Sequence, residues 1–403
     1  MTTSPLDLPS DHPYGPHHLP YGAVSHGDGD VHLAVRVGDH ALDLATAAAG
    51  TEWADALARP TLNAFLDLGP QAWSGLRSWL QDALADEDRR RELEPHLHPL
   101  DGLTLHLPFR VADYVDFYAS EQHATNVGSI FRPDEDALTP NWKHLPIGYH
   151  GRSSTVVVSG TDIVRPTGQR KAPSDPAPVF GPSVKLDIEA ELGFVVGGST
   201  PVGSRVSVDE AGDHLFGVAL FNDWSARDIQ AWEYVPLGPF LGKSFASSIA
   251  AWVTPMAALE HARLPLPAQD PQPLPYLDGS PEALFGLDLT MEVRLNDTVV
   301  AHPPYATMYW SPTQMLAHLT VNGAALTSGD LFASGTTSGD RVDQRGSLLE
   351  LTWNGTEPIT LTDGSTRTFL EDGDTVTITA TAPGPDGTTL TLGEVSGTIR
   401  PAH

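Results

Sequence analysis

One stretch of the sequence alternates charged and apolar residues with the two-residue period of a β-strand. Its charged positions are Lys185, Asp187, Glu189 and Glu191. Its apolar positions are Leu186, Ile188, Ala190 and Leu192. Successive strand side chains point to opposite faces, so three carboxylates share one face and repel one another unless a positive charge lies among them. The strand has either a charged face in water or a face that binds a metal ion, and this stretch alone leaves both open.

A second set of polar residues has helical spacing. Four residues are separated by 4, 3 and 4 positions: Asp223, Arg227, Gln230 and Tyr234. This spacing predicts one face of a helix that begins with Asp223 as its cap and runs through Trp232. The apolar residues 215–221 precede it directly, so the start of the helix should lie against the core, where a carboxylate needs a partner. The alternative is a solvated stripe with an Asp–Arg pair.

Two further segments contain residues suited to proton transfer or charge stabilisation. His123 follows Asp116 and Tyr118 in a polar segment, and histidine transfers protons well near neutral pH. A structural histidine is the alternative. Lys243 lies in residues 238–244, GPFLGKS, which are one residue short of the phosphate-binding pattern because leucine occupies the place of its first glycine. We therefore reject nucleotide binding and expect a loop lysine that faces the same region.

The candidate metal ligands from these segments are Asp116, Glu189, Glu191 and Asp223. All four are oxygen donors, and the chain contains no cysteine. Such a set suits a hard cation such as Mg²⁺, Ca²⁺ or Mn²⁺. Their spacing along the chain does not show whether they converge.

The charge balance argues against several classes of partner. The chain has 51 Asp and Glu against 23 Lys and Arg, a net charge of −28, which disfavours nucleic acid and anionic membranes. No apolar run approaches the ~18 residues of a membrane span. Residues 1–22 lack the basic start and apolar core of a signal peptide. Without cysteine there are no disulfides or thiol nucleophiles. We expect a cytoplasmic protein.

The elements that must position these residues fall into two predicted domains, since 403 residues exceed most single domains. In the first, residues 31–37 alternate as a strand, and a helix is expected after Gly69-Pro70. In the second, strands are expected at 155–158 and 215–221. Turn pairs typical of antiparallel strands follow later: Asn354-Gly355, Asp363-Gly364 and Asp372-Gly373. The sequence predicts a small β-rich domain with a helix, then a larger, mainly antiparallel β domain.

Several longer motifs resemble those of the fumarylacetoacetase (fumarylacetoacetate hydrolase) family. In order along the chain they are DFYAS at 116–120, PIGYHGR at 146–152, DIEAELG at 187–193, NDWSARD at 222–228, PLGPFLGK at 236–243, ASGT at 333–336 and LEL at 349–351. LPYG at 19–22 resembles the start of the family's small first domain. One departure is Ala246-Ser247, where the family usually has Gly-Thr; because serine keeps a hydroxyl, we expect this change to be tolerated.

The resemblance implies a mainly β (α+β) fold, with a small SH3-like N-terminal barrel in residues 1–110 and a larger β-roll catalytic domain in residues 111–403. It also implies a homodimer. The implied reaction is the metal-dependent hydrolysis of a carbon–carbon bond in 4-fumarylacetoacetate, which gives fumarate and acetoacetate in the last step of tyrosine and phenylalanine breakdown.

The resemblance further implies a role for each matching residue. A divalent cation, Mg²⁺ or Ca²⁺, would be bound by Asp116, Glu189, Glu191 and Asp223. His123 would be the general base, oriented by Glu350. Developing negative charge would be stabilised by Arg227, Gln230 and Lys243. The diketo acid substrate would be held by Tyr118, Arg132, Tyr149, Gln230, Tyr234 and Thr336.

Two competing functions stay open at this point. Another enzyme of the same superfamily, such as an acylpyruvate hydrolase or a decarboxylase, would usually be shorter and lack the first domain. A non-catalytic, metal-binding β protein would have no use for His123 or Lys243.

Overall fold

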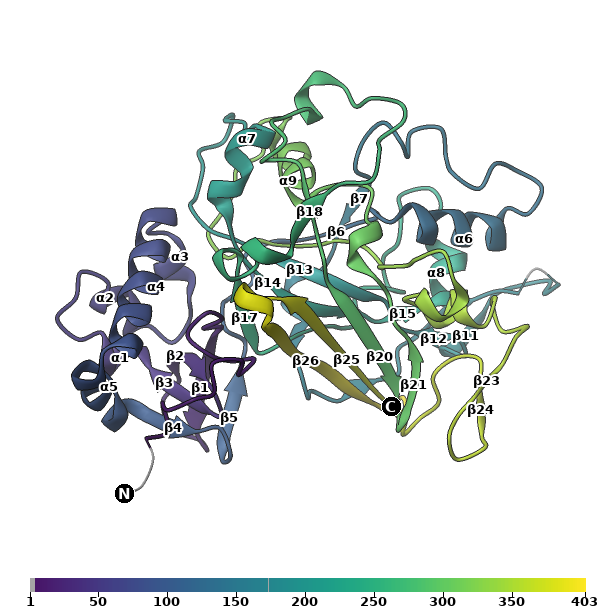
Figure 1. The fold of residues 1–403 in the computed structure, drawn as a ribbon. Helices are drawn as coiled ribbons and strands as arrows, with labels where there is room; N and C mark the ends of the chain where they lie inside the picture. Colours follow the sequence, from purple (N-terminus) through teal and green to yellow (C-terminus); the bar gives the residue numbers. More distant parts are fainter. Residues whose placement is uncertain (1–3, 173) are drawn as a thin grey trace.

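The computed structural model describes residues 4–172 and 174–403, which form two units joined through one sheet (Figure 1). The strands of the N-terminal unit are β1 (Tyr21–His26), β2 (His32–Val37), β3 (His40–Asp43), β4 (Leu97–Pro99) and β5 (Leu103–His106). They pair in the order β4-β3-β2-β1, and β5 also pairs with β1. No sheet among the described strands closes into a barrel, so the SH3-like barrel is not confirmed. The domain boundary at residue 110 remains a prediction.

The helices of this unit are α1 (Leu44–Ala47), α2 (Ala54–Leu57), α3 (Asn63–Leu66), α4 (Pro70–Ala85) and α5 (Glu87–Leu93). The helix predicted after Gly69 is confirmed as α4. Gly69 adopts a φ of 82°, and Pro70 occupies the first helical position, where its missing N–H removes no intrahelical hydrogen bond. Leu76, Leu80 and Leu84 recur every four residues and are buried, so α4 presents its apolar face to the core.

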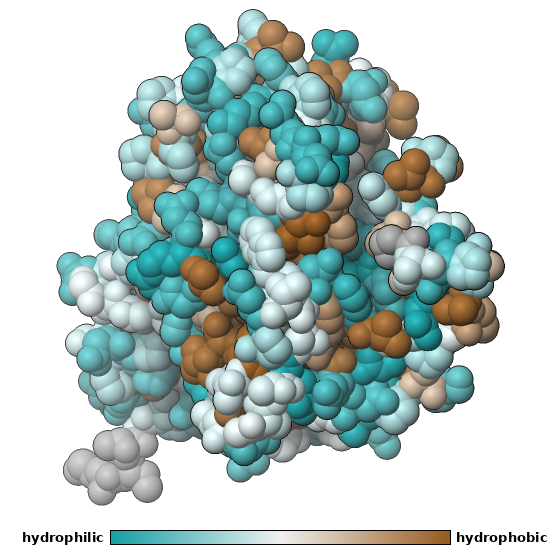
Figure 2. Space-filling view, turned by 90° about the vertical axis from the view of Figure 1, so that its right-hand side faces the viewer, coloured by the Kyte–Doolittle hydropathy of each residue, from teal (hydrophilic) through white to brown (hydrophobic). Residues whose placement is uncertain are grey.

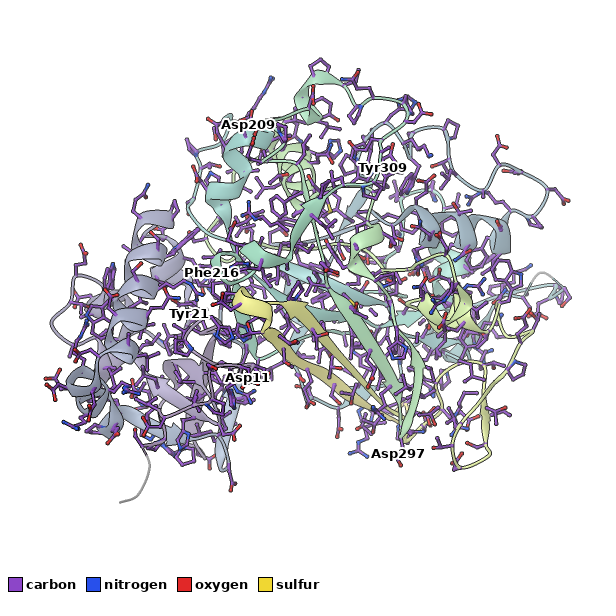
Figure 3. The ribbon with its side chains drawn as sticks, in the orientation of Figure 1. Asp11, Tyr21, Asp209, Phe216, Asp297 and Tyr309 are labelled. Atoms are coloured by element: carbon purple, nitrogen blue, oxygen red, sulfur yellow. The ribbon has the colours of Figure 1, made fainter. Side chains whose placement is uncertain are left out.

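The two units meet at β1. Tyr21 and Gly22 pair with the first residues of β17 (Trp252–Pro255), which makes the sheet continuous across the junction. Tyr21 packs edge-on against Phe216 with ring centroids 5.2 Å apart, and Figure 3 labels both residues. Gly22 is required here because a Cβ would lie 2.6 Å from the ring of Trp252.

The larger unit is mainly β and is built on two sheets. From β17 the first sheet continues through β14 (Leu215–Asp223), β13 (Ala190–Val196), β22 (Leu331–Ala333), β6 (Tyr114–Phe117) and β7 (Gly148–His150). β16 (Ser247–Ile249) also pairs with β14, and β8 (Val156–Val158) pairs with β16. The second sheet contains β21 (Thr298–Ala301), β20 (Thr290–Leu295), β25 (Thr375–Pro383), β26 (Thr389–Arg400) and β9 (Ile163–Val164). β25 and β26 contact β14, so the core lies between the two sheets.

The remaining strands form two-stranded pairs: β10 (Thr167–Arg170) with β11 (Val179–Pro182), β12 (Leu186–Asp187) with β15 (Ser225–Ala226), β18 (Arg263–Pro265) with β19 (Phe285–Leu287), and β23 (Ile359–Thr360) with β24 (Thr366–Arg367). The helices are α6 (Glu121–Phe131), α7 (Val208–Ala211), α8 (Arg227–Glu233), α9 (Pro312–Thr320) and α10 (Leu348–Leu351). The predicted Asp363-Gly364 turn joins β23 to β24. None of the helices in the described residues is long and apolar enough to cross a membrane.

The charged strand predicted at 185–192 is interrupted. Its residues form β12 and the start of β13, with Ile188 and Glu189 between them. Both faces are buried: Asp187 and Glu191 are 0 % exposed and Glu189 is 4 % exposed. The alternative of a charged face in water is therefore wrong.

The helix predicted to start at Asp223 begins later. Asp223 is the last residue of β14, where its backbone is held extended beside Ser247 of β16, and α8 starts at Arg227 with Ala226 as its N-cap. The prediction that Asp223 caps a helix is wrong, because the strand continues through it. Gln230 does lie in α8, and Tyr234 is its C-cap.

Buried side chains hold the N-terminal segment on the junction. Arg77 of α4 donates a hydrogen bond to the carbonyl oxygen of His18 over 2.7 Å. The His18 ring donates from Nδ1 to the Pro13 carbonyl and accepts at Nε2 from the Thr254 hydroxyl of β17, both at 2.9 Å. Burial, together with the charge of Arg77, lowers the pKa of His18 to about 3, so its ring is neutral in the folded protein.

We expect His18 to make the fold sensitive to acid. Its pKa rises to about 6.5 on unfolding, so the unfolded chain binds the extra proton and stability falls as the pH decreases from 6.5 towards 3. Between pH 7 and pH 5, the free energy of unfolding should decrease by about 2 kcal/mol more in the parent than in His18→Gln, which keeps a hydrogen-bonding amide but does not titrate. Urea unfolding at both pH values measures this, and equal decreases would contradict it.

Candidate functional site

Three acidic residues from separate elements converge in the larger unit. Asp116 lies in β6, Glu189 lies between β12 and β13, and Asp223 ends β14. One carboxylate oxygen from each lies within 4.8 Å of the others, and all three side chains are buried. Glu191 of β13 is close enough for the charges of Asp116 and Glu189 to act on it. The structure therefore brings together the acidic residues that the sequence singled out.

Two cationic side chains lie among these carboxylates. Lys243 contacts Glu189, and its Nζ is 2.9 Å from Asp223 Oδ2. Arg227 Nη1 is 2.8 Å from Glu189 Oε1. Burial alone would raise the pKa of Glu189, but Lys243 and Arg227 lower it to about 2. Glu189 is therefore ionised at any pH at which the protein works.

The remaining acidic groups fit a further cation. Burial and the neighbouring carboxylates raise the pKa values of Asp116 and Glu191 well above their usual range. Asp116 Oδ1 and Glu191 Oε1 are buried and lack a hydrogen-bond partner among the described residues. When ionised, the four carboxylates carry more negative charge than Lys243 and Arg227 compensate, because Arg227 also pairs with Asp187, and this excess is unfavourable in a buried site. Because every unused donor is an oxygen, the set fits a divalent cation of the Mg²⁺ or Ca²⁺ type.

The carboxylate of Asp223 is held from two sides. Tyr149 donates its hydroxyl to Oδ2 over 2.9 Å, and Ser247 donates to Oδ1 over 2.7 Å. Ser247 belongs to the Ala246-Ser247 pair that departs from the family pattern. The hydroxyl that serine retains is thus used to orient a predicted metal ligand.

A histidine–carboxylate pair lies beside the cluster. His123 Nδ1 is 2.7 Å from Glu350 Oε2, and both side chains are buried. Glu350 also accepts hydrogen bonds from Asn126, Ser338 and Ser347. Burial would raise the pKa of Glu350, but His123 and the hydrogen-bond donors lower it below its usual value. Glu350 is therefore ionised and accepts a hydrogen bond from Nδ1–H of His123. This leaves Nε2 of His123 as the acceptor, 4.0 Å from Glu189 Oε1.

Other predicted residues surround the cluster with unused polar atoms. Arg227 Nη1 is 3.3 Å from Gln230 Oε1, whereas Arg227 Nη2 is buried without a partner in the described chain. Thr336 Oγ1 is buried and likewise unpartnered within residues 4–172 and 174–403. The ring of Tyr118 packs edge-on against that of His123, with centroids 5.2 Å apart. These atoms are available to a ligand at the cluster.

Two predicted substrate-binding residues lie further out. Arg132 Nη2 donates a hydrogen bond to the Ala137 carbonyl over 2.8 Å. Burial raises the pKa of Tyr118, and the positive charge of Arg132 offsets part of this rise. Tyr234 is 47 % exposed at the end of α8. Neither makes a hydrogen bond or ion pair with the acidic cluster among the described residues, and their roles remain predictions.

Asp187 is a structural component of the site that the sequence analysis did not identify. Its carboxylate accepts hydrogen bonds from Arg227 Nε at 2.8 Å and from the backbone N–H groups of Leu348 at 2.7 Å and Leu349 at 2.9 Å. The latter two begin α10, which carries Glu350. Asp187 thus fixes the arginine and the helix of the histidine–carboxylate pair at once. The alternating pattern puts Asp187 on the same strand face as Glu189. Its backbone partners lie about 160 positions further along the chain, so no local sequence pattern indicates the contact.

Comparison with protein families finds two matches that together span most of the chain. Residues 17–108 match the model described as fumarylacetoacetase N-terminal. Residues 113–400 match the model described as fumarylacetoacetate (FAA) hydrolase C-terminal.

Among characterised relatives, the human fumarylacetoacetase is 45% identical over 418 residues, which cover 100% of this chain and 99% of the relative. The enzyme of Arabidopsis thaliana is 44% identical, with 98% of each chain covered. Among solved structures, a fumarylacetoacetate hydrolase from Exiguobacterium antarcticum has a TM-score of 0.57 at 16% identity, covering 96% of this chain and 100% of that one. A maleylpyruvate hydrolase from Sphingobium with manganese(II) and pyruvate has a TM-score of 0.53 at 16% identity, with 96% and 100% covered. These two structures support the fold.

Asp187→Asn should destabilise the protein strongly. The substitution keeps the side-chain size but leaves the buried charge of Arg227 poorly compensated. It also places an amide NH₂ opposite groups that are themselves donors. We therefore expect the free energy of unfolding to decrease by about 3 kcal/mol. Denaturant unfolding measures it. Asp213→Asn, at an exposed position, is the matched control. An Asp187→Asn protein as stable as this control would show that the buried contacts are not needed.

Proposed function

This chain belongs to the fumarylacetoacetase family, and we propose that the acidic cluster formed by Asp116, Glu189, Glu191 and Asp223 is where it hydrolyses its substrate. The enzyme splits 4-fumarylacetoacetate with water into fumarate and acetoacetate, a step in the breakdown of tyrosine. It is a hydrolase that acts on a carbon–carbon bond. The observation that carries the assignment of the site is the juxtaposition of this cluster with the His123–Glu350 pair.

The cation is proposed to be Mg²⁺ or Ca²⁺, held by the four carboxylates. The two unpartnered oxygens and the uncompensated negative charge of the cluster support this assignment. When bound, such an ion supplies a Lewis acid for the two oxygens of a 1,3-dicarbonyl group. Tyr149 and Ser247 keep the carboxylate of Asp223 in one orientation for this purpose.

His123 is proposed as the general base. Its Nδ1 proton is committed to Glu350, so Nε2 can take a proton from a water molecule while the water oxygen bonds to the fumaryl carbonyl carbon. The carbon–carbon bond then breaks, and its electron pair stays on the acetoacetate fragment as an enolate, which receives a proton to give acetoacetate. The negative charge of Glu350 stabilises the imidazolium form of His123 between these proton transfers.

The stabilisation of developing negative charge is assigned to Lys243, Arg227 and Gln230. The unpartnered Nη2 of Arg227 supports this role, because a buried N–H donor without an acceptor is ready for an oxyanion. Asp187 and Glu189 hold the guanidinium in place, so it need not reorganise when charge develops. Tyr118, Tyr149 and Thr336 are proposed to contact the substrate beside them, with Arg132 and Tyr234 at its outer parts.

A homodimer is also proposed. Its support is an exposed apolar segment at the end of α8 and in the loop after it: Trp232, Val235, Leu237, Phe240 and Leu241. Leu237 is 96 % exposed, an unfavourable arrangement unless another surface covers it. Figure 2 shows one face of the molecule as mainly hydrophilic, with apolar residues in separate groups. A cytoplasmic location belongs to the same proposal and is supported by the net charge of −28, which favours solubility.

His123→Asn should abolish most turnover while the protein stays folded. Without a base at Nε2, kcat for fumarylacetoacetate should fall about 10²- to 10⁴-fold. The loss of substrate absorbance measures turnover, and calorimetric titration with Mg²⁺ or Ca²⁺ shows that the ion is still bound. His144→Asn, an exposed histidine, is the control. Full turnover in His123→Asn with the ion bound would refute the assignment of the base.

Removal of the metal should abolish turnover reversibly. After chelation and dialysis, with elemental analysis to verify the loss of the ion, the parent should be inactive and should recover on addition of Mg²⁺ or Ca²⁺. Asp116→Asn should bind the ion at least tenfold more weakly in calorimetry, because one oxygen ligand becomes neutral. If the metal-free protein is fully active, or if Asp116→Asn binds the ion as tightly as the parent, the metal site is wrong.

A further inference from the structure

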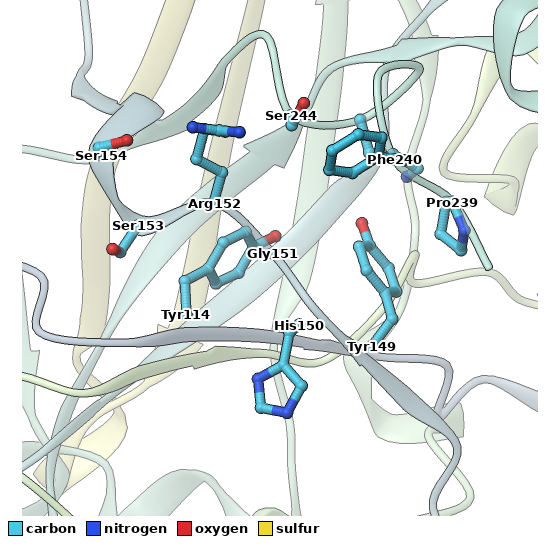
Figure 4. A pocket seen from close by; sticks show the side chains of 11 residues that line it. Tyr114, Tyr149, His150, Gly151, Arg152, Ser153, Ser154, Pro239, Phe240 and Ser244 are labelled. Carbon is cyan, nitrogen blue, oxygen red and sulfur yellow. The ribbon is translucent and has the colours of Figure 1, made fainter. Parts of the chain in front are cut away.

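A cavity of about 340 Å³ opens beside the acidic cluster, on the side of Tyr149 and Lys243 (Figure 4). Both of these residues contact Asp223, so the cavity ends at the cluster. Its walls include Arg152 and Ser154, which the roles proposed above do not use, and Phe240 of the exposed apolar segment. In Figure 4 the Tyr149 hydroxyl and the Arg152 guanidinium point into the same space. A cavity of this volume holds a small organic acid.

Arg152 is an arginine without a counter-ion. Within residues 4–172 and 174–403, its guanidinium forms no hydrogen bond and no ion pair, although the chain has 51 acidic residues to offer. Five N–H donors in a planar fork match a carboxylate in a bidentate arrangement. A permanent positive charge on a cavity wall, kept apart from acidic neighbours in a protein of net charge −28, favours an anionic ligand.

Hydroxyl groups accompany the arginine. Ser153, Ser154 and Ser244 line the cavity, and none of the three side chains has a hydrogen-bond partner in the described part of the chain. Tyr114, which also lines the cavity, is 2 % exposed, and its hydroxyl is buried and unpartnered among the described residues. One guanidinium and the three serine hydroxyls are thus available to a ligand with several acceptor oxygens.

The wall that carries Arg152 is fixed in place. Gly151 donates its N–H to the Tyr114 carbonyl over 2.9 Å, and a Cβ at Gly151 would lie 2.2 Å from the Tyr114 ring, so the chain passes close against that ring. Thr155 donates its hydroxyl to the carbonyl of Ser244 over 2.8 Å. The segment from Gly151 to Thr155 is therefore tied both to β6 and to the loop that carries Lys243, and Arg152 is held at a set place relative to the cluster.

From these observations we propose that the Arg152 cavity is a subsite for one terminal carboxylate of the substrate, with Arg152 as its ionic partner. The inference rests on the proposed function, since the substrate is a dicarboxylate whose reacting carbonyl groups lie between its two charged ends. Arg132 does not line this cavity, so it is assigned to the carboxylate at the other end of the substrate. Lys243 and Tyr149 connect the subsite to the reacting centre. The serine hydroxyls donate to the carboxylate oxygens that the guanidinium does not reach.

Arg152→Gln tests the subsite. The side chain is exposed and unpartnered, so the variant should fold as the parent does. Loss of a charge-assisted contact made equally in the bound substrate and the transition state should raise KM for fumarylacetoacetate about ten- to a hundredfold, with kcat changed less than threefold. Arg205→Gln, at another exposed and unpartnered arginine outside the cavity, should leave KM unchanged. Arg152→Lys should lie between the parent and Arg152→Gln, because it keeps the charge and loses the planar fork.

Product inhibition identifies the end of the substrate that is bound. Fumarate and acetoacetate each carry one of the two terminal carboxylates, and Arg152→Gln should raise the inhibition constant of one of them about tenfold or more, with little effect on the other. The subsite is wrong if Arg152→Gln keeps the kcat/KM of the parent within twofold, or if Arg152→Lys has a KM no lower than that of Arg152→Gln. Absence of turnover in the parent would instead contradict the proposed function, so the two failures are distinct.

Discussion

The repulsion among buried carboxylates is the constraint on which the rest of the catalytic unit depends. Asp116, Glu189, Glu191 and Asp223 come from three separate segments of the chain and lie together in the core, where each charge is poorly screened. Their placement therefore requires cations and donors in fixed positions. Two cations meet this requirement, Lys243 and Arg227. The hydroxyls of Tyr149 and Ser247 supply the donors.

The same constraint links the cluster to the proton-transfer pair. Arg227 neutralises Glu189 on one side and Asp187 on the other, and Asp187 in turn holds the first N–H groups of α10, the helix of Glu350. A carboxylate at the start of α10 satisfies backbone donors that otherwise have no intrahelical partner. The geometry of the His123–Glu350 pair is thus set by the same ion pairs that compensate the cluster, so the acidic cluster and the proposed base are structurally linked.

Sequence patterns predicted the site better than the elements that carry it. Residue types and the order of the family motifs singled out the four carboxylates, His123 and Lys243, because each motif is local, although their spacing did not show that the carboxylates converge. The alternation at 185–192 did not reveal that the strand breaks at Ile188 and Glu189 or that both its faces are buried, since burial depends on distant strands such as β14 and β22, which pair with β13. Asp223 was predicted to cap a helix because helical spacing gives no sign that the strand expected at 215–221 continues to Asp223. Asp187 and Arg152 act through partners or spaces formed by distant segments, which no local pattern reports.

The pairing of β1 with β17 has a consequence for the architecture of shorter proteins with the same catalytic core. β17 is hydrogen-bonded to β1 on one side and to β14, which ends in Asp223, on the other. A catalytic fragment that started at residue 111 would leave β17 as an open edge with unpaired backbone groups, next to the strand that ends in Asp223, a proposed metal ligand. Open edges of this kind promote intermolecular strand addition. The N-terminal unit therefore acts as an edge cap, and a minimal catalytic unit would need a charged, bulged or otherwise protected β17 in its place.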